Sequence, residues 1–175
     1  MFSSPQKNLE EFGISPGSHV ADLGSGSGFY TLAAAKMVGE KGRVYAVDVL
    51  KDMLAKLKNE AQRERLHNVE TIWGNVERLG GTKLVDASVE IVLACNTLFQ
   101  LEHKNDFPLE VKRILKPKGR VLVIDWKESF GGMGPQPGHV VSEESARTLF
   151  EKAGFTFEKG ISAGAHHYGI IFKKI

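Results

Sequence analysis

The apolar residues of the chain follow two spacings that alternate from position 18 onward. Short apolar runs that end in Gly or Asp are separated by longer stretches in which apolar residues recur at helical spacing, and these patterns indicate strands and helices respectively. Strands are expected at 19–23, 43–47, 69–72, 89–94 and 120–125, and helices at 30–38, 51–66, 107–115 and 143–153. The alternation predicts an α/β fold, in which helices cover both faces of a largely parallel sheet.

Local signals place the ends of these helices. Gly39, Asn68 and Gly154 stand just past three of the predicted helices, where a residue in the left-handed conformation commonly ends a helix. Ser142 and Ser145 offer caps for the start of the last helix. A short helical segment is also expected within residues 1–16.

The last part of the chain departs from the alternation. Two strand-like runs, 155–159 and 166–173, are joined by residues 160–164, which leave no room for a helix. We expect the two runs to pair as an antiparallel hairpin. The only segment rich in Gly and Pro, 131–138, lies in a loop at 127–141; this loop is either a small lid over the site or a passive connection.

Composition narrows the class of protein. The 175 residues, 42% of them hydrophobic, fit one globular domain that spans 1–175. Twenty-three basic against 21 acidic side chains give a net charge of +2, far from the excess of an obvious nucleic-acid binder, so nucleic acid is possible but not implied. One cysteine, no signal-like N-terminus and no membrane-spanning apolar run predict a cytoplasmic protein. Whether it is a monomer or a homodimer stays open.

The stretch 20–30, VADLGSGSGFY, connects an apolar strand to a helix through alternating glycines. Glycine permits positive φ and close approach to a ligand, and the free N–H groups at a helix start suit a phosphate or a carboxylate. A dinucleotide fingerprint would need its third glycine at position 29, but Phe29 stands there and the third glycine is Gly28. Asp22, at the strand end, is placed to accept a hydrogen bond from a cationic amine or to order the loop.

Two later strand ends supply further candidate cofactor-binding residues. The run 44–48, VYAVD, ends in Asp48, whose carboxylate is placed to accept both hydroxyls of a ribose. This feature fits a nicotinamide cofactor as well as other nucleoside cofactors. The third strand is followed by Gly74 and Asn75, and the side-chain amide of Asn75 is placed to read the edge of an adenine ring.

These motifs together resemble those of the class I S-adenosylmethionine-dependent methyltransferases, and within them the small-molecule group similar to the ubiquinone/menaquinone biosynthesis methyltransferases. The resemblance covers nearly the whole chain and includes VADLGSGSGFY, VYAVDV, WGNVERL, LKPKGRVLVIDW and VSEESARTLFEKAGF with the hairpin after it. It implies a single Rossmann-like domain with a seven-stranded sheet whose last strand is inserted antiparallel. It also implies S-adenosylmethionine as the cofactor and S-adenosylhomocysteine as its product.

Carried over by position, the resemblance implies how the cofactor is held. Asp22 and the loop 24–28 would hold its methionine part, Asp48 would bind the ribose, and Val49 and Met53 would flank the adenine.

The amino edge of the adenine would face Asn75 and Val76, although the family often has Asp where this chain has Asn75. The full set of expected cofactor-binding residues is Asp22, Gly24, Ser25, Gly26, Gly28, Tyr30, Asp48, Val49, Met53, Asn75, Val76 and Asn96.

Candidates for contact with the methyl acceptor lie at the strand ends. Methyl transfer from a sulfonium is an in-line displacement, so alignment matters more than a strong acid or a metal. Asp125 and Trp126, after the fifth strand, are the expected catalytic pair, with turn capping and packing as alternative roles. Cys95 is expected to be inert packing, and the scattered histidines give no spaced set of ligands, so we expect no metal.

Three function classes stay open from the sequence: an active methyltransferase, a nicotinamide-dependent oxidoreductase, and a protein that binds S-adenosylmethionine without catalysis. For the first class, a small organic acceptor leads and RNA or protein is the alternative. Lys51, Lys58 and Arg65 recur every seven residues, and this basic stripe is either a solvated helix face or a docking surface for RNA or an acidic partner.

Overall fold

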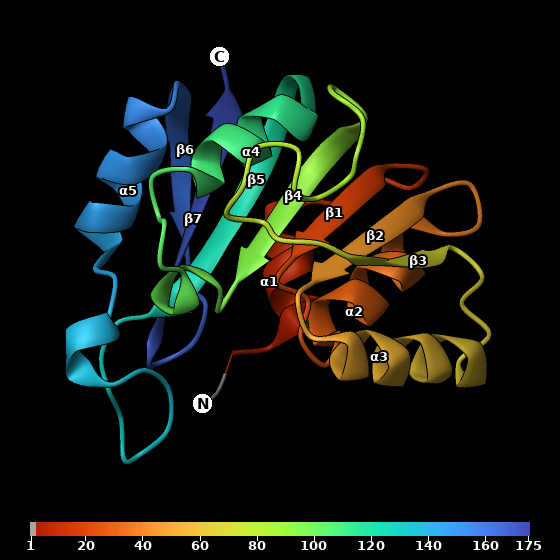
Figure 1. Ribbon diagram of the computed structural model, residues 1–175, viewed down its shortest axis with the longest axis horizontal. Coiled ribbons are helices and arrows are strands. Elements are labelled where there is room, and N and C mark those ends of the chain that lie inside the picture. The colour runs from red at the N-terminus through yellow and green to blue at the C-terminus, as the bar shows by residue number, and fades with distance from the viewer. Residues whose placement is uncertain (1–2) are drawn as a thin grey trace.

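The computed structural model describes residues 3–175 and places their helices on both faces of one sheet (Figure 1). The strands are β1 (His19–Leu23), β2 (Arg43–Asp48), β3 (Val69–Trp73), β4 (Val89–Cys95), β5 (Leu115–Trp126), β6 (Phe155–Ile161) and β7 (His167–Lys174). The α-helices are α1 (Pro5–Phe12), α2 (Phe29–Val38), α3 (Lys51–Arg63), α4 (Phe107–Ile114) and α5 (Glu143–Lys152), with short 3-10 helices η1 (Leu98–Gln100) and η2 (Pro137–His139).

The strands form a seven-stranded sheet in the order β3-β2-β1-β4-β5-β7-β6. The first five in that order pair parallel to one another, whereas β7 runs antiparallel to both of its neighbours, β5 and β6. The predicted fold class is therefore confirmed, including the antiparallel hairpin at the end of the chain.

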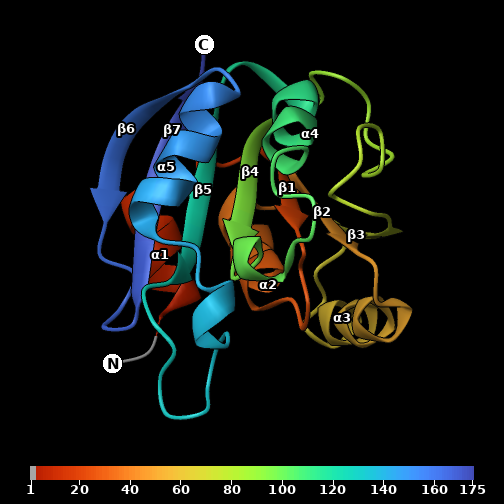
Figure 2. The same cartoon turned by 60° about the vertical axis from the view of Figure 1, so that its left-hand side comes forward.

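Two helical layers bury the sheet between them. Figure 2 shows α4 and α5 in front of the sheet and α1 and α2 behind it. Strand β4 is apolar and buried along nearly all of its length, as expected for a central parallel strand covered on both faces. On α4, the buried side chains of Phe107, Val111 and Ile114 recur every three or four residues and so form the face that packs against the sheet.

The third helix ends earlier than its predicted boundary at position 66. It stops at Arg63, and Arg65 takes the left-handed conformation with φ 57°. The role expected for Asn68 is therefore wrong. Its buried side chain instead donates hydrogen bonds to the carbonyl oxygens of Ala35 and Gly39, both at 2.8 Å. This contact ties the start of β3 to the end of α2.

The other predicted helix boundaries hold. Gly39 and Gly154 have positive φ, 68° and 91°, and the hydroxyl of Ser142 accepts a hydrogen bond from the backbone N–H of Ser145 at 3.1 Å. Strand β5 begins at Leu115, five residues before its predicted start, and pairs there with Val89 across an irregularity in the ladder.

The order of the strands creates a topological switch point at the carboxyl ends of the central strands β1 and β4. The chain leaves β1 toward β2 and β3 on one side, and β4 then pairs with the other side of β1. Ligands of α/β proteins bind at such a switch point, beyond the carboxyl ends of the strands. None of the helices within residues 3–175 has the length and apolar character needed to cross a membrane.

Candidate functional site

The loop between β1 and α2 depends on its three glycines. Gly24, Gly26 and Gly28 have φ values of 75°, 52° and 86°, in the left-handed region that glycine adopts without strain. A Cβ atom on Gly28 would lie 2.2 Å from Cδ1 of Leu57 on α3, and one on Gly24 would lie 2.9 Å from the Thr97 hydroxyl. The glycines therefore allow β1 to turn sharply into α2 while α3 and the β4 end pack against the turn.

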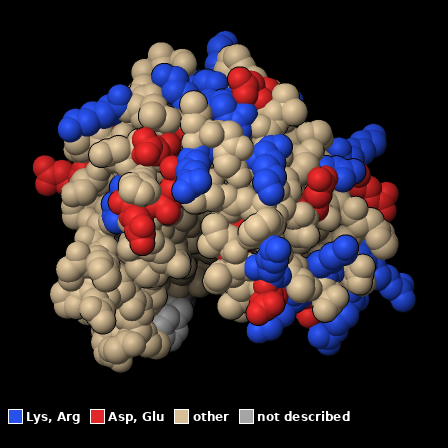
Figure 3. Space-filling model, viewed as in Figure 1, with Lys and Arg blue, Asp and Glu red and all other residues tan. Residues whose placement is uncertain are grey.

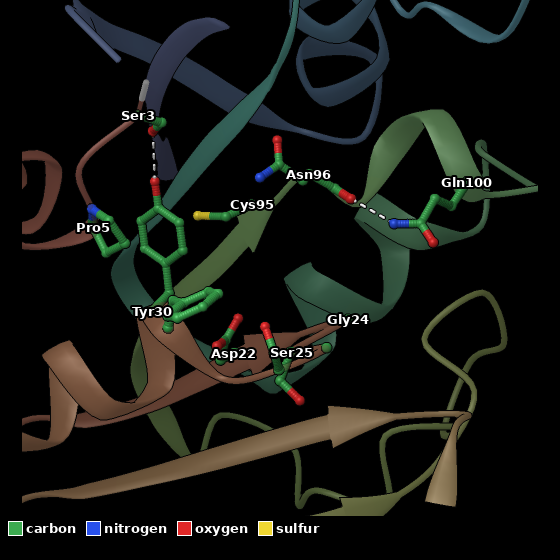
Figure 4. Close-up of a pocket in the computed structure, with 12 residues that line it drawn as sticks. Ser3, Pro5, Asp22, Gly24, Ser25, Tyr30, Cys95, Asn96 and Gln100 are labelled. Atoms are coloured by element: carbon green, nitrogen blue, oxygen red, sulfur yellow. Dashed lines mark hydrogen bonds between the residues drawn. The ribbon is translucent and has the colours of Figure 1, made fainter. Parts of the chain in front are cut away.

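A cavity of about 470 Å³ opens above this loop, between α2, the end of β4 and the N-terminal segment (Figure 4). We call it the Tyr30 cavity. Its lining combines the loop with residues far away in the sequence: Ser3, Pro5, Asp22, Gly24, Ser25, Gly26, Ser27, Phe29, Tyr30, Cys95, Asn96 and Gln100.

A second cavity of about 410 Å³, which we call the Met53 cavity, lies beyond the ends of β2 and β3. Its lining is Gly24, Gly26, Asp48, Val49, Leu50, Met53, Gly74, Asn75, Val76, Glu77, Thr97, Gln100 and Leu101. Because Gly24, Gly26 and Gln100 line both cavities, the two spaces meet above the glycine loop. Figure 3 shows a hollow in this face, between an uncharged lobe at the lower left and the charged surface over α3 at the lower right.

Asp22 supplies a buried carboxyl group to the Tyr30 cavity. Its side chain is 2% exposed and accepts a hydrogen bond from the Thr31 hydroxyl at 2.6 Å. Burial raises the pKa of Asp22 to about 6, and the nearby charge of Asp48 acts in the same direction. A cation in the cavity would favour the ionised form of Asp22, so this position suits an ammonium group.

Asp48 connects the second strand to the glycine loop. One of its carboxylate oxygens accepts a hydrogen bond from the backbone N–H of Gly26 at 2.8 Å, and the other accepts from the N–H of Leu50 at 2.9 Å. A carboxylate has about four lone-pair sites, so two remain for ligand hydroxyls in the Met53 cavity.

Two side-chain oxygens of residues that line the Tyr30 cavity have no hydrogen-bond partner among residues 3–175. They are the hydroxyl oxygen of Ser25 and the side-chain oxygen of Asn96, and both are buried. Unpaired buried polar atoms cost free energy, and Asn96 additionally holds a left-handed backbone with φ 57°. The pair therefore marks a place where a polar ligand would complete the hydrogen bonding.

The predicted adenine-binding residues come together in the Met53 cavity. Val49, Met53, Asn75 and Val76 all line it. The side-chain oxygen of Asn75 accepts a hydrogen bond from the N–H of Glu77 at 2.9 Å, which leaves the amide hydrogens of Asn75 free to donate to a ligand. The cofactor-binding roles of these residues stay predictions.

Other lining residues were not predicted from the sequence. Ser3 and Pro5 reach the Tyr30 cavity from the N-terminal segment, and Thr97 and Gln100 come from the turn after β4. The Gln100 side chain donates to the backbone oxygen of Asn96 at 2.8 Å (Figure 4). The signal available in the sequence for this turn was its place directly after the predicted strand 89–94.

The predicted catalytic pair occupies a different place. Asp125 is fully buried under η1 and accepts a hydrogen bond from the N–H of Trp126 at 2.8 Å. Burial raises the pKa of Asp125 to about 6. The Trp126 ring packs against the His167 ring, with centroids 4.3 Å apart. Neither Asp125 nor Trp126 lines either cavity, and their contact with substrate stays a prediction.

The remaining candidate chemistry is limited. Cys95 is a buried free cysteine, and burial raises the pKa of its thiol well above the ordinary value, so the thiol stays protonated at neutral pH. Across the described residues 3–175, no group of three or more His, Cys, Asp or Glu side chains is arranged to hold a metal ion.

The chain is similar in sequence and structure to known methyltransferases. A SAM dependent methyltransferase from Aquifex aeolicus has a crystal structure that superposes with a TM-score of 0.90 and 33% identity, covering 99% of this chain and 91% of that chain. The ubiquinone/menaquinone biosynthesis C-methyltransferase of Hydrogenovibrio crunogenus is 33% identical over 124 residues, 69% of this chain and 46% of that relative. The arsenite methyltransferase of Halobacterium salinarum is 34% identical over 113 residues, 64% of this chain and 28% of that relative.

The chain thus spans less than half the length of these two curated relatives. The methyltransferase domain family matches residues 14–161, which include the glycine loop, the strand ends that line both cavities and β6, the first strand of the C-terminal hairpin. The chain therefore belongs to the methyltransferase domain family.

Proposed function

We propose that the protein is an S-adenosylmethionine-dependent methyltransferase that acts on a small molecule. The observation that carries the proposal is the junction of the two cavities at the glycine loop, with Asp22 and the unpaired atoms of Ser25 and Asn96 on one side. The similar proteins also support the proposal, because they are named as methyltransferases. One is a SAM dependent methyltransferase, and two others are named for arsenite and for ubiquinone/menaquinone biosynthesis. A cavity of about 470 Å³ is of the size that small ligands occupy.

The residues of the Tyr30 cavity fit the methionine part of the cofactor. The Asp22 carboxylate and the side-chain oxygen of Asn96 would accept hydrogen bonds from its ammonium group, and the Ser25 hydroxyl would donate to its carboxylate. These contacts would pair both buried atoms that lack a partner. The N–H groups of the glycine loop add a partial positive charge beside the carboxylate.

The residues of the Met53 cavity fit the adenosine part. The two remaining lone-pair sites on Asp48 would accept hydrogen bonds from the ribose hydroxyls. Val49 and Met53 give the apolar sides of an adenine slot, and the free amide hydrogens of Asn75 would donate to a ring nitrogen.

When bound, S-adenosylmethionine supplies an activated methyl group. The protein's own contribution is alignment, because the Tyr30 hydroxyl and the Cys95 thiol, which line the Tyr30 cavity, are poor bases. Burial raises the pKa of both the Tyr30 hydroxyl and the Cys95 thiol, so each stays protonated at neutral pH. We therefore favour an acceptor whose nucleophilic atom already carries a lone pair or a negative charge at neutral pH.

Calorimetric titration with S-adenosylmethionine, S-adenosylhomocysteine and NADH tests the cofactor part of the proposal. We expect the first two to bind and NADH not to bind, and Asp48→Ala to weaken binding. Binding of NADH alone would identify a nicotinamide enzyme instead. Release of S-adenosylhomocysteine in the presence of small phenols, quinol precursors or arsenite then tests catalysis, and a protein that binds the cofactor but turns over none of these acceptors would fit the non-catalytic alternative.

A polyanionic acceptor such as RNA is the second candidate. The Nζ atom of Lys51 lies 3.9 Å, and that of Lys83 5.1 Å, from the centroid of the half-exposed Trp73 ring. Basic side chains also gather over α3 in Figure 3. Binding of single-stranded RNA that weakens steeply between 50 and 200 mM salt would favour this candidate, and RNA binding below detection at 50 mM salt would exclude it.

A further inference from the structure

Ser3 and Tyr30 line one wall of the Tyr30 cavity, and Asn8 lies behind them. Asn8, on α1, is 2% exposed, and its amide nitrogen donates hydrogen bonds to the hydroxyl oxygens of Ser3 and Tyr30, both at 2.8 Å. The two hydroxyl oxygens lie 3.1 Å apart. Figure 4 shows the Tyr30 ring rising from α2 so that its hydroxyl meets Ser3, with Cys95 facing the ring. These hydrogen bonds tie Ser3 and α1 to the start of α2.

Asn8, Ser3 and Tyr30 together carry more donor hydrogens than the hydrogen bonds among them use. Asn8 uses both hydrogens of its amide group, and each hydroxyl oxygen accepts one of them. Each hydroxyl group carries one hydrogen of its own, and the contact between the two oxygens consumes only one of the two. Among residues 3–175, one hydroxyl hydrogen is left without a hydrogen-bond partner. Because Ser3 and Tyr30 both line the cavity, this hydrogen is available to a ligand in the cavity.

We propose that Ser3 and Tyr30 form a donor subsite that binds an oxygen atom of the methyl acceptor, with Asn8 as the residue that positions them. This proposal rests on the proposed function. The bound atom is a hydrogen-bond acceptor, such as a carbonyl, phenolate or carboxylate oxygen. The same chemistry is present in the carboxylate of the cofactor, but the Ser25 hydroxyl and the glycine loop already offer donors to that group.

Asn8 gives a sharp test, because its replacement by Asp changes hydrogen bonding without changing side-chain size. An Asp carboxylate has no hydrogens to donate and accepts from both hydroxyl groups. In Asn8→Asp both hydroxyl hydrogens therefore point at residue 8, and the cavity loses its donor although Ser3 and Tyr30 are still present. The double variant Ser3→Ala/Tyr30→Phe removes both hydroxyl groups and serves if Asn8→Asp fails to fold.

The measured quantity is the preference for oxygen in a pair of small probes. ¹⁹F NMR titrations give the Kd of 4-fluoroacetophenone, which has a carbonyl oxygen, and of 1-ethyl-4-fluorobenzene, which has nearly the same shape without it. Both titrations are run with and without S-adenosylhomocysteine. We expect the ratio of the two Kd values to move by about fivefold against the ketone in Asn8→Asp and in the double variant, as for loss of one hydrogen bond.

Tyr45→Phe is the matched control, since Tyr45 lies on β2 and lines neither cavity. It should leave the ratio unchanged, whereas a mere loss of packing in Asn8→Asp would weaken both probes equally. An unchanged ratio in both test variants would overturn the proposal. A normal ratio combined with weaker binding of S-adenosylhomocysteine would overturn it too, and would assign the donor to the cofactor. Failure of the wild type to bind S-adenosylhomocysteine is a separate result, and it would count against the proposed function.

Discussion

The carboxylate of Asp48 accepts a hydrogen bond from the backbone N–H of Gly26 at 2.8 Å, across the gap between the ends of β2 and β1. The residue expected to bind the ribose therefore also holds the glycine loop in shape. Since Gly26 lines both cavities, this single contact links the adenosine and methionine halves of the proposed cofactor site before any ligand binds.

Asp48→Ala should impair both stability and cofactor binding. It leaves the N–H groups of Gly26 and Leu50 without their carboxylate partner, and a hydrogen bond to a charged group contributes about 1.5–3 kcal/mol. We expect S-adenosylhomocysteine to bind at least about tenfold more weakly in calorimetry. Asp48→Asn keeps one acceptor oxygen and should fall in between. Asp52→Ala, on the exposed first turn of α3, is the control, and an equal loss in that variant would contradict the prediction.

Gly28→Ala should destabilise the protein much more than Gly26→Ala. Both residues have positive φ, which costs an L-residue about 1–2 kcal/mol. Only at Gly28 would the new Cβ also overlap Leu57, at 2.2 Å, whereas a Cβ on Gly26 meets nothing within 4 Å. Urea denaturation should show a loss of about 2–4 kcal/mol for Gly28→Ala and about 1 kcal/mol for Gly26→Ala. If overlap is the cause, adding Leu57→Ala should cost less in the Gly28→Ala background than in the wild type.

The free energy of unfolding should fall as pH rises from about 4 to about 6. Burial raises the pKa values of Asp22 and Asp125 from 3.8 to about 6, so between these values the folded state binds more protons than the unfolded state. Because the folded state binds more protons, its stability decreases as pH rises through this window and levels off above it. A rise from 3.8 to about 6 corresponds to about 3 kcal/mol for each group. Asp22→Asn should remove its share, and denaturation curves at pH 4, 5, 6 and 7.5 would measure both effects.

Cofactor affinity should change with pH in the opposite direction. The ionised Asp22 carboxylate attracts the ammonium group of S-adenosylhomocysteine, whereas the protonated form does not. Binding should therefore tighten as pH rises through about 6, the pKa of Asp22, and at pH 5.5 it should release protons. Calorimetry in two buffers with different ionisation enthalpies measures that release. Affinity that is independent of pH between 5 and 7.5 would show that Asp22 does not contact the ammonium group.

The sequence predicts the fold well because each strand and helix carries its own signal. The alternation of apolar runs and helical periods located the strand–helix units, and the short 160–164 connection identified the terminal hairpin. The end of α3 is harder to predict from the sequence, because Arg65 takes the left-handed position after it, where Gly or Asn is usual. The side chain of Asn68 is free to bond the end of α2, a tertiary contact that overrides the local preference.

The candidate site could be predicted only where one motif forms it. The glycine loop and Asp48 lie at strand ends whose meeting follows from parallel pairing. The contact of Asn8 with Tyr30 spans 22 positions and depends on how α1 packs against α2, for which the sequence holds no local signal. Likewise, the strand-end position of Asp125 suggested an open site, whereas η1 folds over its carboxylate and buries it.

Gly134, in the loop 127–141, packs directly against the Trp126 ring. A Cβ on Gly134 would lie 2.7 Å from the Trp126 ring, whereas one on Gly132, which has a similar φ of 75°, would meet nothing within 4 Å. Gly134→Ala should therefore release the loop and speed amide hydrogen exchange across 127–141, and Gly132→Ala should do so much less. Neither variant should change the affinity for S-adenosylhomocysteine, because no residue of this loop lines either cavity.

The same pair of variants separates a lid from a passive connection. If the loop closes over a bound acceptor, its release in Gly134→Ala should lower turnover severalfold while Gly132→Ala stays near the wild type. Wild-type turnover in a Gly134→Ala protein whose loop exchanges faster would identify 127–141 as a connection only. Equal exchange in the two variants would instead mean that Trp126 does not anchor the loop in solution.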